Sequence, residues 1–183
     1  MKKSTIYIGM ALLMSTAFAQ ASELPESVAM TITGTVSGHN PSVSCGVYPA
    51  TESVLISGEN IVDQGAEPGM MNSVVIHVAN PDDLSGCGNE VSAGHFALKL
   101  KGQPDNGQGT SLANTEAQNA ASGVAIGMFD YNTKKMIPVN DGVLDIDKDS
   151  HTVKLGLEMV KLAGQEITDG IVTGSLTIEL TRL

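Results

Sequence analysis

Apolar and polar residues alternate with a period of two near both ends of this chain. Close to the C-terminus, Leu176, Ile178 and Leu180 are separated by threonine and glutamate. Near the other end, the same alternation spaces out Val28, Met30, Ile32, Gly34 and Val36. Successive side chains of a β-strand point to opposite faces, so a period of two predicts a half-buried strand at each place.

The C-terminal strand raises a question of pairing. A strand at a sheet edge exposes unpaired N–H and C=O groups, which favour pairing with another chain. No partner for residues 170–183 is apparent in the chain's own sheet, so we expect the isolated protein to be poorly stable or self-associating. The alternation at residues 28–36 leaves two interpretations open: a strand given to another chain, or the ordinary first strand of a complete sandwich.

The middle of the chain predicts an all-β domain. Short runs with β-type alternation are separated by turns rich in Gly, Asn and Asp, which is typical of a β-sandwich. Strands are predicted at residues 43–47, 53–56, 73–78, 95–101, 124–130, 143–147 and 153–160. Turns are predicted at residues 58–69, 80–89, 102–109 and 140–142, and a loop at 111–121. There is no sign of a repeat or of a second domain.

The N-terminus has the features of a secretory signal peptide. Lys2 and Lys3 precede an apolar run over residues 6–18, and small residues around Ala19 and Ala21 form cleavage sites. The run is too short for a membrane-spanning helix. We expect residues 1–21 to be removed after Ala21, which leaves an exported chain of residues 22–183.

The charge of the exported part excludes some classes of partner. It holds 20 acidic and eight basic residues, so its formal charge is −12. Such a chain is unsuited to nucleic acid or to an anionic membrane surface. The full chain has no Trp and only three Phe and three Tyr, which weighs against a lectin that stacks sugars on aromatic rings. No apolar run in it approaches a membrane span.

The chain has two cysteines, Cys45 and Cys87. In an exported protein, a single pair most simply forms one disulfide. The loop that it closes is worth about 4 kcal/mol in the chain-entropy account. A metal or reactive-thiol pair is disfavoured, because there is no Cys-x-x-Cys motif and no nearby pattern of histidines.

The residues that usually carry chemistry are scattered. His39, His77, His95 and His151 stand singly, without ligand spacing. The acidic run at residues 145–149 resembles the start of a calcium loop, but it lacks the required Gly and the Glu at the twelfth position. We find no phosphate loop, dinucleotide fingerprint or nucleophile motif. The sequence therefore predicts neither an enzyme nor a bound metal or cofactor.

Taken together, these features resemble a fimbrial (pilus) subunit of the chaperone–usher class, similar to type 1 and F17-type pilins. The resemblance is carried by the order of the signal peptide, the alternating extension with its Gly34, Cys45 with a second Cys roughly forty residues on, and residues 121–126. The closing strand starts near Gly170, fourteen residues from the end. One position departs: such subunits usually have an aromatic penultimate residue, and here it is Arg182, the only arginine.

The resemblance implies an incomplete immunoglobulin-like β-sandwich at residues 37–183 that lacks one strand. A periplasmic chaperone lends a strand first, and the extension of a neighbouring subunit, residues 22–36, replaces it at an outer-membrane usher. The inserted residues would be Val28, Met30, Ile32, Gly34 and Val36. The groove would be bordered by Gly170, Leu176, Ile178, Leu180 and Arg182.

The function implied is that of a structural subunit of a bacterial surface fimbria that contributes to cell adhesion. A minor adaptor subunit or a tip adhesin is one alternative. A periplasmic binding protein with a complete sandwich is another.

Overall fold

The computed structural model describes residues 27–36, 45–80 and 84–183. The expected signal peptide, the first residues of the extension and His39 lie outside these ranges. Within them the chain forms eleven strands and one helix. They are β1 (Ser27–Val36), β2 (Gly46–Pro49), β3 (Ser53–Ser57), β4 (Val62–Asp63), β5 (Asn72–Ala79), α1 (Leu84–Ser92), β6 (Phe96–Gly102), β7 (Leu112–Ala113), β8 (Val124–Asp130), β9 (Val143–Asp145), β10 (Thr152–Lys161) and β11 (Thr173–Arg182).

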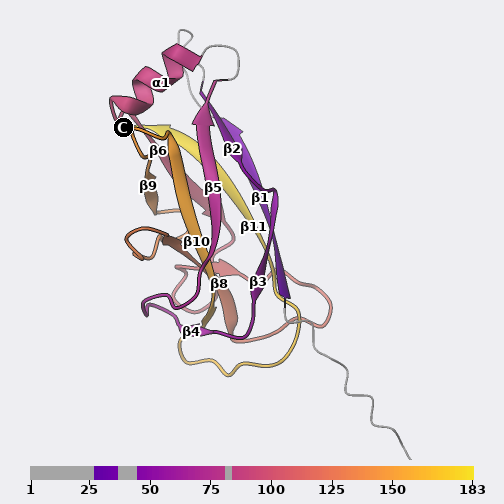
Figure 1. The fold of residues 1–183 in the computed structure, drawn as a ribbon. Coiled ribbons are helices and arrows are strands. Elements are labelled where there is room, and N and C mark those ends of the chain that lie inside the picture. The colour runs from indigo at the N-terminus through magenta and orange to yellow at the C-terminus, as the bar shows by residue number, and fades with distance from the viewer. Residues whose placement is uncertain (1–26, 37–44, 81–83) are drawn as a thin grey trace, which may run out of the picture.

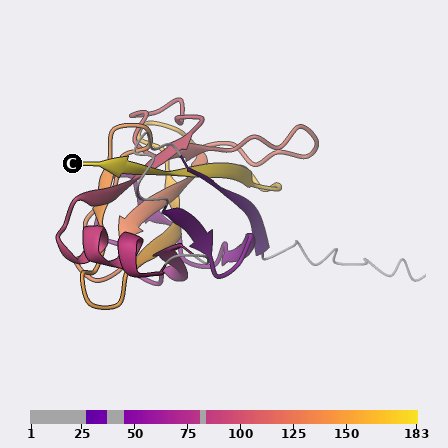
Figure 2. The ribbon, with the colours of Figure 1, turned by 90° about the horizontal axis from the view of Figure 1, so that it is seen from above.

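The strands form two sheets that face each other. One sheet has the order β3-β1-β11-β6-β9, and the other has the order β2-β5-β10-β8-β7, with β4 beside β10. Figure 1 shows the long strands running between an end that carries α1 and an end made of loops. Seen from the α1 end in Figure 2, the two sheets curl around a common interior. The all-β prediction is confirmed.

The core follows from the alternation of the strands. In β11, Leu176, Ile178 and Leu180 are buried, while the residues between them are half-buried. In β10, Val153 and Leu155 point into the same interior. Because each strand turns every second side chain inward, the two sheets share one continuous apolar core.

A second, smaller apolar cluster covers the outer face of the β8–β10 pair. Phe129 and Val160 lie on this face and are fully buried. An added Cβ at Gly127 would lie only 2.8 Å from Cε2 of Phe129, so the glycine makes room for the ring. The other members of the cluster are Ala125, Leu162, Val62, Met71 and Met136.

The loop over this cluster is fastened by a buried carboxylate. Glu158 of β10 is 1% exposed, and its two oxygens accept the backbone N–H groups of Gly69 and Met70, each at 2.8 Å. Bonds from backbone N–H groups to a charged acceptor are among the stronger hydrogen bonds in proteins. They hold residues 69–71 against the sheet, with Met71 packed over Gly156.

Most strand predictions are confirmed to within one or two residues, and the strand at Val124–Asp130 is confirmed in full. The strand predicted at residues 43–47 begins at Gly46, and residues 43 and 44 lie outside the described ranges. The turn predicted at residues 80–89 is wrong in part, because α1 begins at Leu84. Two short strands, β4 and β7, lie in segments predicted as turn and loop.

The loop that joins β6 to β7 is organised by one carboxylate. Asp105 is 6% exposed and accepts N–H groups from Gly107, Gly109 and Ser111 at 2.7, 3.1 and 2.7 Å. The side-chain amide of Gln64 donates a fourth bond at 2.9 Å. Burial raises the pKa of the Asp105 carboxyl, but these bonds lower it more, so the pKa lies below its ordinary value.

We predict that Asp105→Asn destabilises the protein by about 1–3 kcal/mol at pH 7. A carboxyl whose pKa is lowered by folding stabilises above its unfolded pKa of about 3.9, and that contribution is lost as pH falls through the lower folded value. The deficit of the variant should therefore shrink between pH 5 and pH 2, as measured by urea unfolding. The control is Asp141→Asn, at an exposed site. A deficit that does not change with pH would contradict the assignment.

Candidate functional site

The predicted donor strand and the predicted groove lie side by side in this chain. β1 runs between β3 and β11, antiparallel to β3 and parallel to β11. The register places predicted donor positions directly beside predicted groove positions: Ile32 with Leu176, Gly34 with Ile178, and Val36 with Leu180. Two sets of residues that are far apart in the sequence therefore meet in one ladder (Figure 1).

The centre of β1 is buried in the core of this chain. Met30 and Ile32 are 0% and 1% exposed, and both belong to the main core, while Thr31 between them is exposed. The N–H of Ile32 also donates to the carbonyl of Glu52 at 2.8 Å, next to β3. The alternation predicted from the sequence is confirmed at these three positions.

The expectation that the C-terminal strand lacks a partner in its own sheet is wrong for this chain. β11 is flanked by β1 on one side and by β6 on the other. The sequence pattern shows which face of a strand is buried, but it does not show which strand pairs with it. Donation of residues 22–36 to a second subunit remains a prediction, because a single chain does not test it.

Gly170 lies three residues before β11 rather than at its start. There the chain runs beside residues 119–121. Ile171 donates its N–H to the carbonyl of Asn119 at 2.7 Å and accepts the N–H of Ala121 at 2.9 Å. An added Cβ at Gly170 would lie 2.5 Å from the Asn119 carbonyl oxygen. Glycine is therefore required by this close approach of two backbones.

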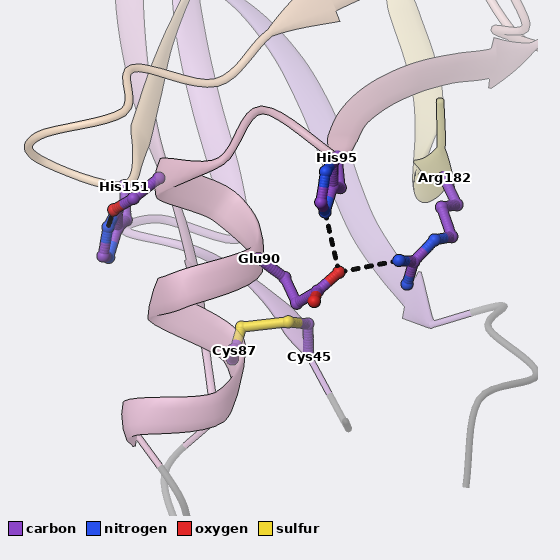
Figure 3. Close-up of a disulfide and its surroundings, with 7 residues drawn as sticks. Cys45, Cys87, Glu90, His95, His151 and Arg182 are labelled. Atoms are coloured by element: carbon purple, nitrogen blue, oxygen red, sulfur yellow. Dashed lines mark hydrogen bonds and ion pairs between the residues drawn. A yellow bond between two sulfur atoms is a disulfide. The ribbon is translucent and has the colours of Figure 1, made fainter. Parts of the chain in front are cut away.

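Arg182 ends β11 in contact with α1 and β6. Its guanidinium donates to Oε2 of Glu90 at 2.8 Å and lies 5.6 Å from the centre of the Phe96 ring. His95 Nδ1 contacts the same Glu90 oxygen at 3.0 Å (Figure 3). The hydrogen bond from His95 and the charge of Arg182 hold the pKa of the Glu90 carboxyl below its ordinary value. Nothing in the sequence spacing indicated these partners.

The predicted disulfide is confirmed. It joins Cys45, just before β2, to Cys87 in α1, with 5.4 Å between the Cα atoms. Both cysteines are buried. A further contact fastens the end of α1, because the Ser92 hydroxyl donates to the carbonyl of Lys148 at 3.0 Å and lies 2.9 Å from His151 Nε2. The hydroxyl has one proton, so the His151 ring nitrogen is the donor in this second bond.

The described residues also form a hollow on the protein surface. A hollow of about 400 Å³ lies beside β6, β7 and β11 and is lined by residues that include Lys101, Leu112 and Thr177. In the ranges described, no three or more His, Cys, Asp and Glu side chains are grouped so that they could hold a metal ion. Of the helices described, none is long and apolar enough to cross a membrane.

Among solved structures, the chain is similar to the P pilus rod subunit PapA, with 15% sequence identity and a TM-score of 0.48. The similarity covers 81% of this chain and 100% of that chain. No protein-family model and no curated protein sequence matches the chain.

We predict that Ile32→Ala lowers the free energy of unfolding of the mature chain by about 2–5 kcal/mol, because it empties a buried site between the sheets. Thr31→Ala, at the exposed neighbouring position, should change it by about 0.5 kcal/mol or less. Denaturant unfolding of both variants measures the difference. Equal, small effects would mean that β1 does not occupy its own sheet in solution.

Proposed function

We propose that this protein is a structural subunit of a bacterial surface fimbria, exported through the periplasm, and that it polymerises by exchanging β1 between subunits. The observation that supports this most is the position of β1, an alternating strand next to the expected cleavage site that fills the place beside the C-terminal strand. The sequence resemblance to chaperone–usher subunits points the same way. Its partners would be a periplasmic chaperone, an outer-membrane usher and other subunits.

The connectivity of β1 allows it to leave. Its Ser27 end pairs with Ser57 at the end of β3, and its Val36 end lies beside Leu180 near α1. From Val36 the chain continues to Cys45, a span of up to about 30 Å for nine residues when extended. Beyond that point the disulfide holds the chain. Withdrawal of β1 would therefore break its ladders with β3 and β11, while the disulfide would still hold the chain at Cys45.

The orientation of β1 constrains how a neighbour could use the same place. Inserted parallel to β11, as in this chain, a strand from a second subunit would bring the two α1 ends together. The acceptor's own β1 also leaves its sandwich at the α1 end, so the same end would give one strand and receive another. Such an assembly could not grow in one direction. Inserted antiparallel to β11, the donor's α1 end would meet the acceptor's loop end. That contact is heterologous and repeats without closing, which makes a filament.

The reversed strand also pairs more favourably. Antiparallel ladders are slightly more stable per residue than parallel ones. A strand with period-two alternation keeps its apolar side chains inward when it is reversed, provided that the register is kept. Main-chain hydrogen bonds then supply affinity, and the alternate side chains supply the fit to the groove. We therefore propose that β1 is parallel within its own subunit and antiparallel in the fibre.

The same position of β1 favours one second candidate, an exported binding protein with a complete sandwich. In that case β1 is a permanent strand and never exchanges. Its core residues Met30 and Ile32 would serve stability only. The two functions differ in one property, whether the place of β1 accepts a strand from outside the chain.

We predict that a variant lacking residues 22–36 is rescued by a peptide of residues 27–36 added during refolding. Filling the open place between β3 and β11 should raise the melting temperature, and a hundredfold excess over Kd corresponds to about 2.7 kcal/mol. The same peptide with Ile32→Asp is the matched control, because a carboxylate without a partner is costly to bury. Rescue by both peptides or by neither would favour the complete sandwich.

We predict that Ile32→Asp abolishes fibres when it is the sole copy in cells that export the protein. The groove between β3 and β11 remains, so chaperone-bound subunits should accumulate, but their own β1 cannot be inserted into a neighbour. Thr31→Asp places the same charge on the exposed face and should allow fibres. Electron microscopy and co-purification with the chaperone measure the two effects. Normal fibres from Ile32→Asp would exclude β1 as the exchanged strand.

A further inference from the structure

Two ties from different parts of the chain meet on the short helix α1. Cys87 carries the disulfide to Cys45, and Glu90 carries the ion pair to Arg182. The two positions are three residues apart, so they are neighbours on the helix surface. Figure 3 shows both ties leaving the same stretch of α1.

The ties hold two segments with opposite roles in the proposed exchange. Cys45 follows β1 along the chain, and its disulfide to Cys87 fixes the base of the strand that a subunit would give away. Arg182 is the last residue of β11, the strand that borders the place where a neighbour's β1 would lie. The strand that a subunit donates and the strand that borders its acceptor site are therefore both connected to α1.

The root of β1 is poorly held by its own strand. β2 has four residues, and its ladder pairs only with β5, at the edge of the second sheet. A pull on the chain before Cys45 would therefore act first on a short edge ladder. The disulfide transfers that pull to Cys87, which is 1% exposed in the core.

Helix α1 is stabilised by these contacts more than by its own sequence. It has nine residues and contains Gly86 and Gly88, and isolated helices of this length are unstable in water. Val91 and Cys87 insert into the core, while Glu90 is held by Arg182 and His95. The helix has little intrinsic stability, and it is held by contacts to Cys45, to His95 and Arg182, and to the loop at Lys148.

Resting on the proposed exchange of β1, we propose that α1 is a mechanical junction of the fibre. Tension enters a subunit through its donated strand at Cys45 and leaves through β11, which holds the neighbour's strand. The Cys45–Cys87 bond and the Glu90–Arg182 pair connect these two points across α1. They transmit the tension to α1 and β11 instead of to β2, so the ladder between β2 and β5 is not pulled apart.

The test is force spectroscopy on single fibres. Arg182→Gln and Glu90→Ala should lower the force of the first extension step relative to the wild type and raise the rate of that step several-fold. Arg182→Lys keeps the charge and should restore much of the force. Asn89→Ala, at the exposed neighbouring site on α1, is the matched control and should match the wild type.

A Cys45→Ala/Cys87→Ala variant should show an early step of about 15–20 Å as residues 45–49 detach, at about 3.5 Å per residue. If this variant does not fold, Arg182→Gln and Glu90→Ala still decide the question, because they change half-exposed side chains. Wild-type forces in both of these variants would overturn the junction. Failure of the wild type to form fibres would instead overturn the proposed function.

Discussion

Without β1, the strands β3 and β11 would face each other across an open gap, each with a row of unpaired backbone groups. β1 closes that gap with ladders on both of its edges and places Met30 and Ile32 in the core. Because buried backbone groups must be paired and apolar side chains must be covered, some strand has to occupy this place whenever the chain is folded. The two candidate functions differ in which strand fills this place, the chain's own β1 or a strand from another chain.

The rest of the sandwich is stabilised by contacts that do not involve β1. The disulfide, the ion pair of Arg182 and the buried carboxylates of Asp105 and Glu158 each fix a loop or a helix through partners outside β1. The six strands β5, β6, β8, β9, β10 and β11 pair among themselves. Withdrawal of β1 would therefore break its ladders with β3 and β11 and expose Met30 and Ile32, while these other contacts persist.

The sequence allowed the long strands to be predicted because alternation records which side chains are buried. Prediction from alternation failed where a segment is held or a side chain is buried by contacts that its own pattern does not record. α1 contains two glycines and has low helix propensity, and it is held by Cys87 and Glu90 rather than by its own sequence. The outer face of β8 and β10 is buried under a loop, so Phe129 and Val160 break the polar side of the pattern. The place of β1 could not be predicted, since alternation identifies a face and not a neighbour.

A strand that pairs within its own chain has an advantage over a competing strand from another chain. A short linker gives the resident strand an effective concentration in the millimolar range, whereas free subunits at micromolar concentration compete a thousandfold less well. That ratio corresponds to about 4 kcal/mol. In the proposed exchange, reversal from a parallel to an antiparallel ladder would supply part of the difference along the ten residues of β1. On the proposed function, a chaperone strand that kept the place occupied while β1 was free would remove this competition altogether.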